Sequence, residues 1–413
     1  MQQQVLDKFT VEPLRQMRES HTYRTMRLLE SPEASRVMLH GEGNSREQIL
    51  LASNSYLDLA NVEELKQAMA KAVLEWGTGS GGARLTTGNK TPHEELETVI
   101  ADFKGEEAAI TFNTGYMANV GAISALCGKS DFVFSDELNH ASIIDGIRLS
   151  RAKCFVYRHN DMADLTRAIE AAKKEFDERR KASPESGRTD GSGNDFRGLI
   201  VTDAVFSMDG DLADLPALLD IAREHEVLLM IDEAHATGVL GRTGRGLAEH
   251  YGCGHADVTV GTLSKAVASE GGFVVGKRQL VEFLRNKARS FIFTTAMAPA
   301  VAAAAANNLR YIDAHPERVR QLQDNVKFFC EVLRREGIEV PTTDSAIVPI
   351  VIGDEAAALD ASAILQQKGL LIPAIRYPTV AKGQARLRAS LMATHTQAEL
   401  EFAAKEIAKV LGK

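Results

Sequence analysis

Short apolar runs separated by helical patterns dominate the chain from about residue 50 to residue 290. An apolar stripe at Leu215, Leu218, Leu219 and Ala222 has the spacing of one helix face and lies between two such runs. Strand–helix–strand units of this length favour right-handed crossovers and a parallel sheet. The runs predict buried strands at Ala108–Phe112, Phe132–Phe134, Cys154–Tyr157, Leu199–Thr202, Val227–Ile231, Val258–Gly261 and Phe273–Gly276.

The two ends of the chain follow a different pattern. Residues 1–50 are polar and mixed in charge, and we expect a helical arm leading into a strand near Ile49–Ala52. Beyond an alanine-rich helix over Ala300–Tyr311 we expect helices near 316–336 and 397–411 and strands at Ile347–Ile352 and Ala385–Ser390. The sequence therefore predicts a large three-layer α/β domain over 51–300, with a mainly parallel sheet. The N-terminal segment 1–50 and the C-terminal segment 301–413 are expected to form a smaller α+β domain.

The most polar stretch of the chain, Lys173–Asp195, predicts the end of a helix followed by a flexible surface loop, and we assign it no function.

Composition narrows the class of protein. The chain has 413 residues, is 44% hydrophobic and carries a formal net charge of −8, which disfavours nucleic acid or an anionic membrane as partner. The four cysteines are widely spaced, as expected of a reduced cytoplasmic protein and not of a disulfide scaffold or zinc site. Met1–Val5 lacks the pattern of a signal peptide, and no apolar run approaches the roughly 20 residues of a membrane span.

The candidate with the clearest chemistry is Lys265, which closes the segment Gly261-Thr262-Leu263-Ser264-Lys265 after a predicted strand. A lysine just past a strand can project into the crevice at the carboxyl edge of the sheet, where α/β proteins bind ligands. Burial there lowers the pKa of the amine and makes it a nucleophile toward an aldehyde. Taken alone, such a lysine is more often merely a solvated loop residue.

A second candidate changes that balance. The strand Val227–Ile231 ends in Asp232-Glu233-Ala234-His235, which places two carboxylates and an imidazole at the same kind of edge. A buried carboxylate needs a cation, and a protonated pyridine nitrogen is one. Metal binding is a competing use of this segment, but no second histidine cluster lies near it, and we expect no metal. A strand-end aspartate that only caps a turn is the structural alternative.

The segment Phe112-Asn113-Thr114-Gly115-Tyr116 leaves a predicted strand and opens a helix. Free backbone N–H groups at the start of a helix suit a phosphate. The segment is not a GxxxxGK[ST] loop, so a nucleoside triphosphate is not indicated. Thr114 can equally be a simple N-cap.

Several weaker candidates can line the same crevice. His140 follows the strand Phe132–Phe134 and can stack on a cofactor ring, and Ser207 follows Leu199–Thr202 and can bond a ring hydroxyl. The glycine-rich stretch Gly77–Gly82, with Arg84, is either a close approach to a ligand or a flexible turn. On the predicted strand Ala385–Ser390, Arg386 or Arg388 can bind a carboxylate bidentately, or form only a surface salt bridge.

In this order the segments resemble the α-oxoamine synthases, a family of fold-type-I enzymes that use pyridoxal 5′-phosphate (PLP). The resemblance covers residues 50–400, and it rests on segments 53–57, 79–84, 113–119, 135–142, 206–211, 232–238, 261–265, 293–296 and 386–396. It implies a decarboxylative condensation of an amino acid with an acyl thioester. Segments 112–146 and 388–396 favour the branch of the family that uses alanine and a pimeloyl thioester.

The resemblance also implies roles for single residues. Lys265 would form the Schiff base with PLP, Asp232 would pair with the pyridinium nitrogen, and His140 would stack on the ring. His235 and Ser207 would contact the ring hydroxyl, and Asn54 and Arg388 would hold the amino-acid carboxylate. The phosphate would be held by the backbone of Gly115 and Tyr116, by Thr262, and by Thr295 of a second subunit, which implies a homodimer with a shared active site. Arg24 or Arg27 of the arm would meet the acyl substrate, carried by coenzyme A or by a carrier protein.

Three departures from the family pattern are visible, and several functions stay open. Asp58 stands where the family motif ends in glycine, Ala381 where a proline is common, and Ala266-Val267-Ala268-Ser269 replaces the usual Ala-Leu-Gly. Other members of the family use glycine or serine with acetyl, succinyl or long-chain thioesters, and pockets separate one methylene by only about 1–3 kcal/mol. Transamination and a catalytically silent dimer partner are the remaining alternatives.

Overall fold

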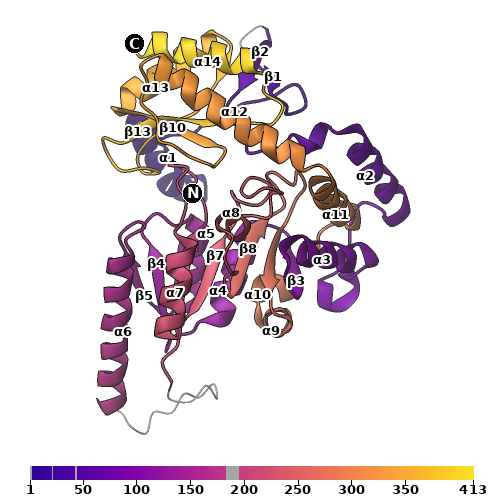
Figure 1. Ribbon diagram of the computed structural model, residues 1–413, viewed down its shortest axis with the longest axis vertical. Helices are drawn as coiled ribbons and strands as arrows, with labels where there is room; N and C mark the ends of the chain where they lie inside the picture. Colours follow the sequence, from indigo (N-terminus) through magenta and orange to yellow (C-terminus); the bar gives the residue numbers. More distant parts are fainter. Residues whose placement is uncertain (1, 21, 42–43, 183–194) are drawn as a thin grey trace.

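The computed structural model describes residues 2–20, 22–41, 44–182 and 195–413. A seven-stranded sheet with the order β3-β9-β8-β7-β6-β4-β5 forms its centre (Figure 1). Only β9 runs antiparallel to its neighbours β3 and β8, and the other neighbouring strands pair in parallel. The strands are β3 (Ala108–Phe112), β4 (Phe132–Asp136), β5 (Lys153–Tyr157), β6 (Gly198–Asp203), β7 (Leu228–Asp232), β8 (Val258–Thr262) and β9 (Gly272–Gly276).

The central strands are mostly apolar because both faces of the sheet are covered there, whereas the edge strand β5 exposes Cys154 and Val156. Successive side chains point to opposite faces, so Met230 packs in one apolar layer while Leu229 and Ile231 pack in the other. One face is covered by α4 (Gly115–Leu126), α5 (Ala141–Ser150), α9 (Arg278–Lys287) and α10 (Arg289–Ile292). The other is covered by α3 (Thr91–Lys104), α6 (Met162–Ala182), α7 (Leu215–His225), α8 (Leu247–Tyr251) and α11 (Pro299–Ala314). The predicted three-layer α/β class is confirmed.

Segments from both ends of the chain form the smaller part of the molecule. β1 (Arg36–Leu39) and β2 (Arg46–Leu50) pair with β11 (Leu370–Leu371), and β10 (Ile347–Gly353) and β12 (Ala374–Ile375) pair with β13 (Ala385–Ser390). These strands lie beside α12 (Pro316–Arg335), α13 (Glu355–Gln367) and α14 (Gln397–Val410) (Figure 1). The helix α2 (Glu63–Trp76) and the short turns Leu59–Asn61 and Arg84–Gly88 complete the connection to the large domain. The boundaries 50/51 and 300/301 stay a prediction.

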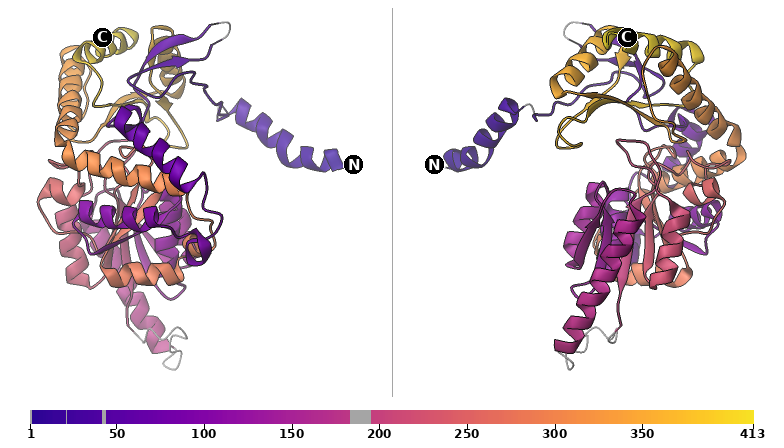
Figure 2. Two further views of the ribbon diagram at one scale, coloured as in Figure 1. Left: turned by 90° about the vertical axis from the view of Figure 1, so that its right-hand side faces the viewer. Right: turned by 60° about the vertical axis from the view of Figure 1, so that its left-hand side comes forward.

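The N-terminal helix α1 (Gln2–Glu19) projects away from the rest of the chain (Figure 2). Its apolar side chains are exposed, Phe9 by 76% and Leu6 by 61%. A helix with an uncovered apolar face is not stable by propensity alone in water, because most helical stability in proteins comes from packing.

The polar stretch contains the end of a helix, as the sequence predicts. Helix α6 ends at Ala182, within the stretch that begins at Lys173. Ion pairs one turn apart on its surface, Glu175 with Arg179 and Asp177 with Arg180, support those polar turns. Residues 183–194, where the rest of the expected loop falls, lie outside the described residues.

Two of the departures from the family pattern sit at left-handed backbone positions. Asp58 has φ 53°, and its carboxylate accepts hydrogen bonds from Asn61 and, at 3.0 Å, from Thr394. Ala268 also has φ 53°, three residues after Lys265, and its backbone N–H donates to the Lys265 carbonyl at 2.9 Å. Aspartate tolerates this region through local hydrogen bonds, whereas alanine has no such compensation. Ala268 is therefore a strained position.

Replacing Ala268 with glycine should raise the free energy of unfolding by about 0.5–1 kcal/mol, because glycine adopts positive φ without a Cβ clash. The midpoint of urea unfolding measures the change. As a matched control, Ala266→Gly should lower the midpoint, since Ala266 is buried and lies outside the positive-φ set. A lower midpoint for Ala268→Gly would contradict the strain.

Candidate active site

The carboxyl ends of the central parallel strands bring the chemistry-bearing residues to one edge of the sheet. Asp136, Asp203, Asp232 and Thr262 are the last residues of β4, β6, β7 and β8, and Asp203 lies directly opposite Asp232 in the strand register. Lys265 follows three residues after the end of β8. The structure thus brings Lys265, Asp232, His235 and His140 together at this edge, as their positions in the sequence predict.

The side-chain amine of Lys265 has a lowered pKa. Its Nζ lies 2.8 Å from Nε2 of His235. Burial lowers its pKa to about 8, against the opposing effect of the nearby carboxylates of Asp232 and Asp203. The amine is therefore unprotonated to a far greater extent than an ordinary lysine, by about half near pH 8, and the unprotonated form is the one that attacks an aldehyde.

A chain of hydrogen bonds extends from Lys265 to the small domain. Nδ1 of His235 lies 2.6 Å from the Tyr56 hydroxyl, which donates to Oδ1 of Asn54 at 3.1 Å. Nη2 of Arg388 donates to the same Asn54 oxygen at 3.3 Å. Burial holds the pKa of His235 well below its usual value, so its ring is neutral. Tyr56, which is fully buried, belongs to this chain although only its motif was singled out in the sequence.

The carboxylate of Asp232 is held by two donors. The Ala234 backbone N–H reaches Oδ1 at 2.9 Å, and the Asn119 side-chain amide reaches Oδ2 at 2.6 Å. Nearby, the backbone N–H of His140 donates to Asp203 at 2.8 Å. Burial and the neighbouring charge of Asp232 raise the pKa of Asp203 well above its usual value. Sequence reasoning missed Asp203 and Asn119, and the only available signal for Asp203 was its place at the end of β6.

The start of α4 offers a site for a phosphate. The Thr114 side chain caps the Met117 N–H at 3.1 Å, and the N–H groups of Gly115 and Tyr116 donate to no acceptor within the described part of the chain. A Cβ on Gly115 would lie only 3.2 Å from the Thr262 side chain, so glycine permits this close approach. The exposed Ser264 hydroxyl lies 2.8 Å from Thr262 Oγ1 and is a further candidate that the sequence analysis missed.

Arg388 is buried on β13 and faces the loop after β6. Its Nε donates to the Ser207 backbone carbonyl, and its Nη1 donates to Ser390 Oγ at 2.7 Å. Ser207 is half-buried at the same place. Arg386, the other candidate for a carboxylate, instead forms an ion pair with Asp209. Of the two arginines, Arg388 is the one that shares Asn54 with the Tyr56 chain.

Two sequence candidates have structural roles away from this edge. Glu233 forms a buried ion pair with Lys104 at 2.5 Å and accepts the Leu247 N–H at 2.7 Å. Arg84 forms a buried ion pair with Glu97 at 2.9 Å. The glycine-rich stretch packs against another part of the chain, since the Gly82 carbonyl accepts the Ala296 N–H at 2.9 Å.

Three of the predicted contacts are not made within a single chain. The Thr295 side chain is exposed, and its backbone carbonyl accepts a hydrogen bond from Asn113 at 3.0 Å. Arg24 and Arg27 are exposed after α1, where Arg24 lines a groove with Arg376 and Tyr377. No hydrogen bond or ion pair links these residues to Lys265 or Asp232 among the residues that the structure describes.

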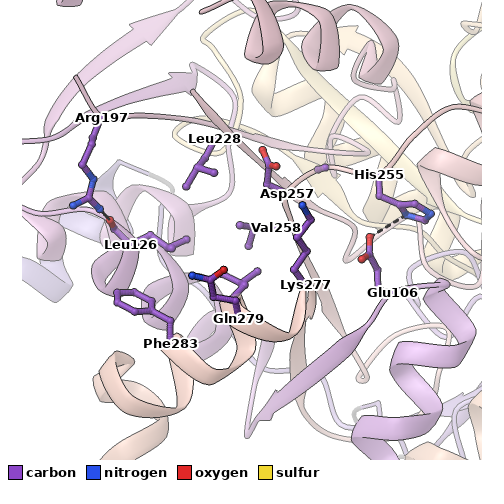
Figure 3. Close-up of a pocket in the computed structure, with 12 residues that line it drawn as sticks. Glu106, Leu126, Arg197, Leu228, His255, Asp257, Val258, Lys277, Gln279 and Phe283 are labelled. Atoms are coloured by element: carbon purple, nitrogen blue, oxygen red, sulfur yellow. Dashed lines mark hydrogen bonds and ion pairs between the residues drawn. The ribbon is translucent and has the colours of Figure 1, made fainter. Parts of the chain in front are cut away.

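A hollow at the opposite edge of the sheet contains none of the predicted residues. It lies where Leu228 and Val258 begin β7 and β8, and Glu106 and His255 approach each other there at 3.6 Å (Figure 3). Elsewhere in the described residues no group of three or more histidine, cysteine, aspartate or glutamate side chains is placed to hold a metal ion. Among the described helices, none has the length and apolar character needed to cross a membrane.

His159 joins the two loops that carry His140 and Ser207. Its Nδ1 lies 3.1 Å from Asp136, and its Nε2 lies 2.7 Å from Asp211. Although burial disfavours the cation, hydrogen bonds to the two carboxylates raise the pKa of His159 to about 10. His159 is therefore a cation across the physiological range and fixes the spacing of the two loops.

Comparisons with known proteins agree with the fold. The model of the aminotransferase class I and II family matches residues 46–407. The putative 8-amino-7-oxononanoate synthase of Desulfovibrio desulfuricans is 50% identical over 400 residues, covering 96% of this chain and 97% of that protein. The 8-amino-7-oxononanoate synthase of Thermoanaerobacter pseudethanolicus is 42% identical over 403 residues, covering 97% and 96%. A solved serine palmitoyltransferase from S. paucimobilis with bound PLP and myriocin has a TM-score of 0.86 at 30% identity, covering 98% of this chain and 99% of that one.

Replacing His159 with glutamine should lower stability most below pH 6.5. The folded pKa of about 10 lies above the unfolded value of about 6.5, so the stabilisation is complete at low pH and is lost as pH rises toward 10. Urea midpoints of both proteins at pH 6, 8 and 10 measure the difference. The neighbouring exposed variant Arg158→Gln should show a small difference that does not fade over this range. A constant loss in His159→Gln from pH 6 to 10 would refute the assignment.

Proposed function

The chain belongs to the aminotransferase class I and II family, and we propose that it condenses L-alanine with a pimeloyl thioester to give 8-amino-7-oxononanoate, an intermediate of biotin synthesis. The observation that carries the proposal is the similarity over nearly the whole chain to curated relatives with that name, at 50% and 42% identity. Within the family the chain most resembles the α-oxoamine synthases, and it is a PLP-dependent acyltransferase.

The residues at the edge of the sheet fit PLP. An amine with a lowered pKa suits the aldehyde, a carboxylate held by Asn119 suits the ring nitrogen, and free amides at the start of α4 suit the phosphate. Lys265 would hold the aldehyde carbon, Asp232 the nitrogen, and Gly115, Tyr116, Thr262 and Ser264 the phosphate. When bound, PLP supplies an electron sink for the α-carbon of the amino acid.

The contacts of these side chains support a separate role for each of them in the reaction. Arg388 and Asn54 would hold the carboxylate of the amino acid at the end of the hydrogen-bond chain from Lys265. Lys265 would take the α-proton and later return a proton, which its lowered pKa of about 8 permits near neutral pH. His235 and Ser207 would contact the ring hydroxyl, and His140 would cover the ring and donate to the thioester carbonyl.

A second candidate substrate set is favoured by one observation. The solved serine palmitoyltransferase superposes over nearly the whole chain with a TM-score of 0.86. Serine with a long-chain thioester is therefore the first alternative, ahead of glycine with acetyl or succinyl thioesters, the substrates of glycine C-acetyltransferase and 5-aminolevulinate synthase. The acyl donor is proposed to be coenzyme A or a carrier protein.

We also propose that the protein works as a homodimer with a shared active site. Phe293 is 70% exposed beside Thr295, and the apolar face of α1 is uncovered. A second copy over these surfaces would bury them and would bring Thr295 to the neighbouring phosphate. It would also allow Arg24 or Arg27 of one copy to meet the acyl substrate of the other.

A cytoplasmic location is part of the same proposal. It is supported by the four cysteines, which are free in the structure, Cys127 and Cys330 being buried.

The function is tested by release of the free thiol, with alanine, glycine and serine each combined with pimeloyl, acetyl, succinyl and palmitoyl thioesters. Alanine with the pimeloyl thioester should give the highest kcat/KM, because the pocket must match the acyl chain as well as the amino acid. A clear preference for glycine with the acetyl thioester, or for serine with the palmitoyl thioester, would overturn the substrate proposal. Amino-group transfer without thiol release would overturn the reaction class.

The role of Lys265 is tested in the same assay with an inactive variant and a matched control variant. Lys265→Ala should release no thiol, and borohydride should fix no PLP to it, because the amine that binds the aldehyde is gone. Lys277→Ala, at the opposite edge of the sheet, should keep both properties. Normal turnover in Lys265→Ala would refute the role of that lysine.

The dimer is tested by sedimentation. The protein should sediment with the mass of two chains, and Phe293→Asp should sediment as one chain and lose thiol release, because a charge would be buried at the interface. Phe402→Asp, an equally simple change at a 44% exposed residue of α14, should leave the mass unchanged. A fully active single-chain species would refute the shared site.

A further inference from the structure

Asn119 lies between two groups of the proposed site that come from different elements. It is buried on α4, and its side-chain amide donates both N–H groups. One reaches Oδ2 of Asp232 at 2.6 Å, at the end of β7. The other reaches Oγ of Ser142 at 2.9 Å, in the first turn of α5. A single amide therefore links the carboxylate to the segment that carries His140.

Ser142 passes this contact to the His140 ring. Because its hydroxyl oxygen accepts from Asn119, its O–H is free to donate to His140 Nδ1, which lies 2.7 Å away. The Ser142 backbone N–H approaches the same Nδ1 at 3.3 Å. The backbone N–H can only donate, so Nδ1 is the acceptor, and the Ser142 hydroxyl then donates to it as well. In the neutral ring the remaining proton is then on Nε2.

The electrostatics of the site agree with a neutral ring. Burial lowers the pKa of His140, and Lys265 acts in the same direction against the opposing charge of Asp232. Nε2 has no hydrogen-bond partner among the residues that the structure describes. The Nε2 N–H is thus available to a bound group, whereas Nδ1 is occupied.

The charge of the Asp232 carboxylate fixes the orientation of the Asn119 amide, although this orientation leaves one hydrogen-bonding atom of the amide unpaired. Its carbonyl oxygen is buried without a hydrogen-bond partner in the described structure. Rotating the amide by half a turn would place that oxygen against the Asp232 carboxylate. The unpaired carbonyl oxygen costs stability, and the hydrogen bond of the same amide to the Asp232 carboxylate offsets part of that cost.

We propose that Asn119 and Ser142 are positioning residues, which hold Asp232 toward the ring nitrogen of the cofactor and hold His140 as its Nε2–H tautomer. The inference rests on the proposed function and deepens it. Neither residue touches the reacting atoms. Asn119 fixes one oxygen of Asp232 while Ala234 fixes the other, and Ser142 selects the ring nitrogen that keeps the proton.

The first test measures the wild-type protein and uses one variant only to assign its signals. Nitrogen NMR of the PLP-loaded protein labelled with ¹⁵N-histidine reports which ring nitrogen carries the proton, and the His140→Asn variant identifies the His140 signals by their loss. We expect His140 to be protonated at Nε2 and not at Nδ1 near neutral pH. A proton on Nδ1, or on both nitrogens, would overturn the proposal.

The second test separates positioning from packing. Ser142→Ala should lower kcat by about 10- to 100-fold, by analogy with other misplaced or wrongly protonated groups. Its affinity for PLP should stay within about twofold of wild type, because the phosphate and aldehyde contacts remain. Ser142→Thr keeps the hydroxyl and should recover most of the lost kcat. Ser150→Ala, on the same helix with its hydroxyl bonded to the Ile147 carbonyl, should leave kcat unchanged.

Asn119→Ala should act on the cofactor as well as on His140. Release of Asp232 should shift the pH midpoint of the visible absorbance of bound PLP, a shift that Ser142→Ala should not show. In the double variant the loss of kcat should be smaller than the product of the two single losses, because both residues act on the same ring. The linkage between Asn119 and Ser142 would be contradicted if the two losses of kcat multiply in the double variant. It would also be contradicted if Asn119→Ala leaves the pH midpoint of the PLP absorbance unchanged.

The outcomes also distinguish this inference from the proposed function. A wild-type protein that binds no PLP or releases no thiol refutes the function. A wild-type protein that does both, with variants that keep wild-type kcat and PLP absorbance, refutes the positioning roles alone. If a variant does not fold, as judged by circular dichroism, the NMR measurement on wild type still decides.

Discussion

The contact between the Lys265 amine and the His235 ring, 2.8 Å long, is the interaction on which the rest of the site depends. It places a nucleophile of lowered pKa at a buried edge that also holds the carboxylates of Asp232 and Asp203. Several titratable groups can be buried together only if few of them are charged at the same time. The His235 ring meets this condition because burial keeps it neutral. The surrounding hydrogen bonds hold these groups close together and help to set which of them are charged.

The sequence predicted the central sheet well for a physical reason. Strands such as Leu228–Asp232 are buried on both faces, so they form unbroken apolar runs that no solvated element shows. The elements that were missed lack such a signal. β1 and β12 are short strands in local antiparallel pairs, and β11 is two residues long and pairs with β2 from the other end of the chain. Strands of this length are too short to show an alternating pattern of apolar and polar residues.

The same distinction applies to the site. Lys265 and Asp232 could be singled out because Asp232 lies at the end of one recognisable strand and Lys265 lies three residues after another. Tyr56, Asn119 and Ser142 could not, because they are ordinary polar residues whose roles depend on contacts between distant elements. Glu233 was predicted to lie at the same edge as Asp232, but its side chain forms an ion pair with Lys104. Adjacent residues at a strand end point in opposite directions. The roles of Thr295, Arg24 and Arg27 remain predictions, because a single chain does not contain the surfaces they would meet.

The hydrogen bond between Arg388 and Asn54 joins residues 334 positions apart, and β2 pairs in parallel with β11 across a similar separation. During synthesis on the ribosome the first of each pair emerges long before the second exists. The central sheet can form while β2, already paired with β1, still lacks its second neighbour β11, so one exposed strand edge persists until Leu370–Leu371 is made. Completion of the substrate pocket is therefore a late event in the biogenesis of the chain, and chaperone dependence should be greatest for nascent chains of intermediate length.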